Sequence, residues 1–297
     1  MVLENAIARR ALSRRNFLSG VGATAGAAAA LAVAGCSSKA YPPPINTPPK
    51  GLTDADILNF ALNLEYLEAE YYLRAATGSG LTSEDAGSNA GTVTGGTQVS
   101  FATPALKQYA LEIANDELAH VRFLRKQLGA GAVSRPNIDL TASFNAAAAA
   151  AGIGPAFNPF ADEKSFLLGA FVFEDVGVTA YHGAAGLLTS TAILGAAAAI
   201  MAVEAYHAGE IRTLIAEAGS TYVDLANKIS ALRAKAGGGA ETNLSGSTIV
   251  AADSDSIAYD RTTDQVLHIV YLNGAAGIKS GGFFPSGLNG NITAPAS

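Results

Sequence analysis

The sequence predicts an all-α protein built around a bundle of four long helices, with a C-terminal extension of shorter helices and loops. Three observations support this fold class. Apolar residues recur at spacings of three and four along four long segments, capping residues, glycine and proline bound these segments, and Glu and His recur on them at helical spacing. The chain has 297 residues, of which 49% are hydrophobic and 15% charged, so it can bury a sizeable core.

The N-terminal 35 residues predict a signal peptide. The run SRRNFL at residues 13–18 matches a twin-arginine export signal, whose recognition depends on Arg14 and Arg15. The apolar run that follows, residues 21–34, is too short to cross ~30 Å of hydrocarbon as an anchor. We therefore expect the twin-arginine translocase to be a partner and the mature protein to lie outside the cytoplasm, in the periplasm or its equivalent.

The single cysteine of the chain, Cys36, ends the run VAGC, which resembles the cleavage box of bacterial lipoproteins. This predicts a lipidated Cys36 that holds the protein to the membrane by its lipid alone. The alternative is ordinary cleavage after Ala40, which removes Cys36. Proline-rich residues 36–51 predict an extended tether. One cysteine excludes an internal disulfide, a multi-cysteine zinc site and a cysteine-ligated iron–sulfur cluster.

Residues 52–219 contain the four expected bundle helices. Thr53 and Thr103-Pro104 are typical helix starts, and Gly129 and Gly219 typical ends. The helices are predicted at about residues 53–76, 104–128, 162–188 and 191–218. The connections are a Gly/Ser/Thr-rich loop over residues 77–100 and a long crossover over residues 130–161 with room for one short helix.

Two further parts of the sequence, the alanine-rich residues 187–203 and the C-terminal extension, are predicted to contain helices. The alanine-rich residues 187–203 have the apolar character of a membrane span, but they end at Glu204 and lack flanking Lys or Arg, so we expect a buried bundle helix. In the extension, residues 220–297, we expect helices at about 222–235 and 263–272, with loops packed on the bundle. The last helix opens with the capping box Thr262-x-x-Gln265.

The residues that predict a functional site are Glu and His. Two of the four histidines stand three positions after a glutamate, in Glu117-x-x-His120 and Glu204-x-x-His207. Residues three apart share a helix face, so each pair can reach one metal ion together. The apolar neighbours of both pairs indicate that these faces point into the core.

The first and third bundle helices supply two further carboxylates. Glu65 is followed seven positions later by Tyr72, and Glu174 seven positions later by Tyr181. The chain thus repeats a Glu…Tyr helix followed by a Glu-x-x-His helix. Pairing of the two halves by a pseudo-two-fold axis would bring four Glu and two His together.

Several neighbouring residues leave alternatives open. Glu68, one turn after Glu65, is a candidate for an additional ligand or for the ligand in its place. Tyr72 and Tyr181 either hydrogen-bond the ligands or fill the core. The remaining histidines, His182 and His268, are expected to be structural.

The distribution of basic residues favours metal ions over a proton-sharing polar core. On ideal helix geometry no Lys or Arg shares the face of a ligand Glu on its own helix. Burying an unpaired carboxylate costs several kcal/mol, so four of them must be protonated, hydrated or neutralised by cations. Two divalent ions would cancel the charge of four glutamates.

With these motifs the sequence resembles the ferritin-like superfamily, whose bundles hold two metal ions with this ligand pattern. The runs NLEYLEAEYY at residues 63–72 and FEDVGVTAY at 173–181 look like the desiccation-related ferritin-like proteins. The long loop and the extension, which exceed a minimal ferritin subunit, argue against a storage cage.

The resemblance implies two Fe or Mn ions, with Glu117 and Glu204 as bridging ligands and Glu65, Glu174, His120 and His207 as terminal ligands. A carboxylate-rich site suits these metals. It implies reactivity toward dioxygen or hydrogen peroxide, of a ferroxidase or peroxidase type, in stress protection. The alternatives are manganese-catalase-like peroxide dismutation, a desiccation-protective protein without turnover, and a metal-binding module.

The charge of the chain limits its partners. The formal net charge is −6, and the first 35 residues contribute four of the arginines, so the remainder is more acidic still. Nucleic-acid binding requires a basic surface, and we therefore expect no nucleic-acid partner. Self-association of the chain is left open.

Overall fold

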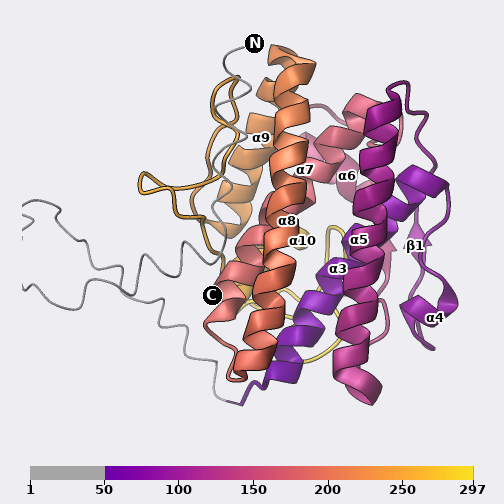
Figure 1. Ribbon diagram of the computed structural model, residues 1–297, viewed down its shortest axis with the longest axis vertical. Coiled ribbons are helices and arrows are strands. Elements are labelled where there is room, and N and C mark those ends of the chain that lie inside the picture. The colour runs from indigo at the N-terminus through magenta and orange to yellow at the C-terminus, as the bar shows by residue number, and fades with distance from the viewer. Residues whose placement is uncertain (1–50, 297) are drawn as a thin grey trace, which may run out of the picture. The chain divides into compact units, whose positions relative to one another are not determined.

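The computed structural model describes residues 51–296, and its core is the predicted four-helix bundle (Figure 1). The long helices are α3 (Asp54–Thr77), α5 (Pro104–Leu128), α7 (Glu163–Ala185) and α8 (Thr191–Ala218). Helix α3 packs along α5, α7 packs along α8, and the two pairs meet between α3 and α7. The signal peptide, Arg14, Arg15, Cys36 and the tether up to residue 50 lie outside the described residues.

The helix ends follow the capping chemistry of the sequence, with one exception. Thr53 and Asp56 form a capping box at the start of α3, and Gly78, at φ 82°, ends this helix in the left-handed conformation. Thr103 occupies the N-cap position of α5 but caps no backbone N–H, contrary to our prediction. Its hydroxyl instead donates to Glu163 Oε1 at 3.0 Å, which ties the start of α5 to the start of α7.

The two long connections meet in a small sheet that the sequence did not indicate. The first holds α4 (Ser83–Ala86) and β1 (Val93–Thr94), and the second holds the 3₁₀ turn η1 (Gly129–Gly131), β2 (Ile138–Asp139) and α6 (Ala142–Ala150). Strands β1 and β2 pair in parallel. Two residues are too few to show a strand periodicity, whereas the single short α-helix in the crossover is confirmed.

Helix α8 is part of the bundle, although its length and composition alone would allow it to cross a membrane. Glu204 and His207 are buried on its inner face. The opposite face is exposed at Ala198, Ala202 and Tyr206. Our expectation of a buried helix therefore holds for one face of α8 only.

The C-terminal extension packs on the bundle. Helix α9 (Ser220–Gly237) lies against α8 and α7, and α10 (Thr263–Val270) lies against α9 and α7. The capping box of Thr262 and Gln265 is present at the start of α10.

A buried ionic cluster joins the extension to the bundle. Asp175 of α7 lies 2.8 Å from the Arg212 guanidinium of α8 and 2.7 Å from that of Arg233 in α9. Arg233 also pairs with Glu241, which in turn pairs with Arg261 at 2.6 Å. The cluster thus links α7, α8, α9 and the segment before α10 through alternating charges.

Candidate metal centre

The six residues that the sequence selected as ligands converge inside the bundle, and each long helix contributes to them. Their side chains come from α3 (Glu65), α5 (Glu117, His120), α7 (Glu174) and α8 (Glu204, His207). All six residues are at most 8% exposed. They form two groups in which the possible ligand atoms lie within 4.8 Å of one another.

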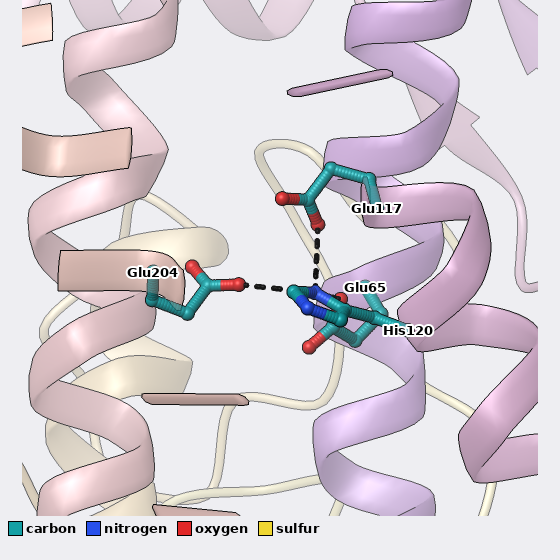
Figure 2. Close-up of side chains that lie close together, drawn as sticks. All are labelled: Glu65, Glu117, His120 and Glu204. Atoms are coloured by element: carbon teal, nitrogen blue, oxygen red, sulfur yellow. Dashed lines mark ion pairs between the residues drawn. The ribbon is translucent and has the colours of Figure 1, made fainter. Parts of the chain in front are cut away.

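The first group surrounds the His120 ring. Figure 2 shows Glu117 and Glu204 pointing toward this ring from α5 and α8, with Glu65 beside it on α3. His120 Nδ1 lies 3.2 Å from a Glu65 oxygen, 3.4 Å from Glu204 Oε1 and 3.7 Å from Glu117 Oε2. One nitrogen and three carboxylates from three helices therefore face the same point.

The second group consists of Glu117, Glu174 and His207. His207 Nδ1 lies 3.1 Å from Glu117 Oε1 and 3.7 Å from Glu174 Oε2. Glu117 directs one oxygen to each histidine, which suits the bridging role expected of it. Glu204, the other expected bridge, belongs to the first group only.

Eight polar atoms of this centre are buried and form no hydrogen bond. This is true of Nδ1 of both histidines, both carboxylate oxygens of Glu117 and of Glu204, and one oxygen each of Glu65 and Glu174. Buried polar atoms in folded proteins are nearly always hydrogen-bonded. Carboxylate and imidazole atoms directed at common points are the donor set of Fe and Mn sites, so these residues fit a pair of such ions.

The expected absence of basic counter-charges is confirmed for residues 51–296. Within this range only His120 and His207 form ion pairs with the four glutamates. Two arginines of the bundle helices have other partners: Arg212 pairs with Asp175, and Arg74 pairs with Glu70.

Burial raises the pKa of three of the four carboxyl groups. The pKa of Glu65 rises to about 7 and that of Glu174 to about 8, chiefly because burial penalises the charged form. The pKa of Glu204 rises well above its usual range through burial and through the charge of Glu117. Without cations, these side chains therefore hold protons near neutral pH.

Glu117 shows the opposite behaviour because it lies between the two histidines. Burial alone would raise its pKa, but pairing with His120 and His207 lowers it to about 2. The pKa of His207 is correspondingly raised to about 10, since pairing with Glu117 and the charge of Glu174 outweigh burial. Without cations, protonated imidazole rings therefore balance part of the carboxylate charge.

Each tyrosine of the repeat donates to the glutamate of the opposite helix pair. Tyr72 of α3 donates to Glu174 Oε1, and Tyr181 of α7 donates to Glu65 Oε1. The other oxygen of each glutamate faces a histidine. The hydroxyl groups therefore fix the carboxylate orientations, and both rings are also part of the buried core.

The remaining candidates lie outside the two groups. Glu68 is 5% exposed and belongs to neither group. His182 Nδ1 lies 3.0 Å from the Tyr259 carbonyl, and His268 Nδ1 lies 2.7 Å from that of Asn273. Neither histidine belongs to the two groups of possible ligands.

Sequence reasoning missed Asp116, whose Oδ2 lies 3.2 Å from His207 Nε2. A carboxylate on the second ring nitrogen is the usual partner of a metal-binding histidine. The contact spans α5 and α8, so no spacing within one helix reveals it. The only indication in the sequence was that Asp116 directly precedes the candidate ligand Glu117.

Comparison with known proteins agrees with this geometry. The ferritin-like domain family matches residues 53–217, and the chain belongs to this family. It is 32% identical to the desiccation-related protein PCC13-62 of Craterostigma plantagineum over 72% of this chain and 76% of the relative. It is 30% identical to the ferritin-like catalase Nec2 of Nesocodon mauritianus over 80% of this chain and 84% of the relative.

Proposed function

We propose that this protein binds two Fe or Mn ions in the bundle and dismutates hydrogen peroxide. The observation that carries the proposal is the set of buried ligand atoms without hydrogen bonds on Glu65, Glu117, His120, Glu174, Glu204 and His207. Fe or Mn ions would supply the redox chemistry, since the chain's own residues at the centre undergo none. The relative named a ferritin-like catalase supports peroxide as the substrate.

The residues of the chain hold and enclose the reacting species. Four carboxylates and two neutral imidazoles match the charge of two divalent ions, and Tyr72 and Tyr181 orient two of the carboxylates. An apolar cavity of about 190 Å³ between α5 and α8 is lined in part by Tyr181, whose hydroxyl donates to Glu65. In dismutation two hydrogen peroxide molecules give one dioxygen and two waters, with no outside reductant.

The test is oxygen evolution by protein loaded with Mn or Fe. One dioxygen released for every two peroxides consumed is the expected result, and His120→Ala should abolish it while His182→Ala should not. If the protein instead consumes dioxygen while it oxidises ferrous iron, and leaves peroxide unchanged, then it is a ferroxidase and the proposed dismutation is wrong. Protein that takes up no Fe or Mn at all would overturn the metal centre itself.

A second candidate is protection without turnover, as the relative named desiccation-related suggests. In this case the bundle binds ions or protons as part of its core, and the loaded protein leaves peroxide unchanged. Metal binding with no turnover of peroxide or ferrous iron would favour it.

We further propose that the protein is exported by the twin-arginine pathway and held to the membrane by lipid on Cys36. The support is the sequence of the first 40 residues. Replacing Arg14 and Arg15 together by Lys should leave the precursor inside the cell. Cys36→Ser should release soluble protein or stall processing, whereas an unchanged N-terminus and membrane fraction would favour ordinary cleavage.

A further inference from the structure

Helices α3 and α7 share a glutamate that a tyrosine follows seven residues later, and they differ between these two positions. Three residues after Glu65, α3 has Glu68, and three residues after Glu174, α7 has Gly177. Four residues further on, both helices have the tyrosine that donates across the bundle. At equivalent positions of the repeat, α3 therefore carries a fifth carboxylate, Glu68, and α7 carries Gly177, which has no side chain.

Because Gly177 has no side chain, the carboxylates of Glu204 and Glu68 can lie close to α7 at this position. A Cβ at this position would lie 2.3 Å from Glu204 Oε2 and 3.4 Å from Glu68 Oε1. Both oxygens therefore face the same small volume above α7. Glu204 Oε2 is fully buried and has no hydrogen-bond partner.

The C-terminal extension closes the other side of Glu68. A cavity of about 20 Å³ adjoins Glu68 and Gly177, with Ile269 and Val270 of α10 and Phe283 in its wall. This volume holds about one water molecule, which is too little to hydrate a carboxylate. Within residues 51–296 Glu68 forms no ion pair with a basic side chain, and the charges that act on it most are those of the other four glutamates.

From this geometry we propose that Glu68 is a fifth ligand residue, and the fourth carboxylate, for the ion of the first group, and that the two ion positions therefore differ in affinity. The two groups consist of Glu65, Glu117, His120 and Glu204, and of Glu117, Glu174 and His207. In the proposed arrangement Glu68 joins the first of them when an ion is bound. Gly177 is the positioning residue that makes room for the extra ligand. This inference rests on the proposed binding of two ions.

The test separates the two positions by removing one histidine at a time. His207→Ala leaves the first position intact, and His120→Ala leaves the second. Mn²⁺ binding is measured by equilibrium dialysis with elemental analysis, for each background with and without Glu68→Gln. We expect Glu68→Gln to lower the Mn²⁺ affinity roughly 10–100-fold in the His207→Ala background, the range seen when groups around a metal site are removed, and to change it little in the His120→Ala background.

Two further variants keep the test decisive. Gly177→Ala pushes on Glu204 and Glu68, so it should weaken the same position as Glu68→Gln without altering a ligand. Glu210→Gln makes the same chemical change on α8, outside both groups, and should leave the first position unchanged. Equal losses in both backgrounds, or no loss in either, would overturn the role of Glu68. Failure of the unmutated protein to bind two Mn²⁺ ions would overturn the proposed centre instead.

Discussion

Two successive residues of α7 carry buried carboxylates in opposite environments. Asp175 lies within 2.8 Å of the guanidinium groups of Arg212 and Arg233. Glu174, one residue earlier, accepts a hydrogen bond from the Tyr72 hydroxyl, and its other oxygen lies 3.7 Å from His207 Nδ1. The permanent cations complete the first environment within the chain, whereas the second is complete only with protons or metal ions. The kind of counter-charge therefore distinguishes the functional carboxylates from the structural ones.

The largest effect that this comparison predicts is on folding. Asp175→Asn leaves two buried guanidinium groups without their shared counter-charge, and we expect it to lower the free energy of unfolding by about 3–5 kcal/mol. Glu174→Gln removes a carboxyl group that already holds a proton in metal-free protein, so it should cost far less. Urea unfolding of both variants after chelation measures the difference. Equal losses would show that the two environments are equivalent.

The second prediction concerns metal content. His120→Ala and His207→Ala each remove a ligand atom from one group, so each should lower the bound Fe or Mn sharply, by one ion of the pair or more. His182→Ala and His268→Ala, outside both groups, should retain the metal. Elemental analysis of protein purified under identical conditions measures this. Equal losses from all four variants would indicate destabilisation and not coordination.

The third prediction is that metal-free protein loses stability as the pH rises from about 5 to 8. The folded-state pKa values of Glu65 and Glu174, about 7 and about 8, exceed the ordinary value of 4.5. The native state therefore binds more protons than the unfolded state in this window, so its advantage disappears as these groups ionise. The raised pKa of His207 acts in the same direction above pH 6.5.

The ionic cluster of Asp175 provides the contrast in the same experiment. Burial would raise the pKa of Glu241, but Arg233 and Arg261 lower it below its ordinary value. The contribution of Glu241 to the free energy of unfolding is therefore lost only in acid, below about pH 4.5. In metal-loaded protein the carboxylates are ionised and the imidazoles neutral, so its stability should not fall between about pH 5 and 8. Thermal melts of chelated and loaded samples decide this. Metal-free protein that gains stability toward pH 8 would contradict the assignment of uncompensated carboxylates.

Much of the fold and six site residues followed from spacing within single helices. Glu117 and His120 are three apart, and the helical period alone places them on one face. The contacts that the sequence did not show are those between helices. Tyr72 lies seven residues, or about 10.5 Å of helix rise, beyond Glu65, so it reaches the glutamate of another helix instead. The same applies to the ionic cluster, whose members are separated by up to 86 residues of chain, from Asp175 to Arg261.

The smallest predicted effect concerns Asp116, which distinguishes the two histidines. Asp116 Oδ2 lies 3.2 Å from His207 Nε2, while no carboxylate of residues 51–296 forms an ion pair with His120 Nε2. The Asp116 side chain is 43% exposed, so this pair contributes at most about 1 kcal/mol to folding. Its role is to orient the ring and increase the basicity of the nitrogen that faces Glu117 and Glu174.

Asp116→Asn should therefore lower the Mn²⁺ affinity of the second position by roughly 10-fold, the lower end of the range for such partners, and leave thermal stability almost unchanged. The same substitution in the His207→Ala background should have no effect on the remaining ion, because its target ring is absent. Equilibrium dialysis in the two single-histidine backgrounds measures both. A loss of affinity at the first position would mean that Asp116 acts through its general negative charge on the bundle, since His120 is out of its reach, and the orienting role would have to be abandoned.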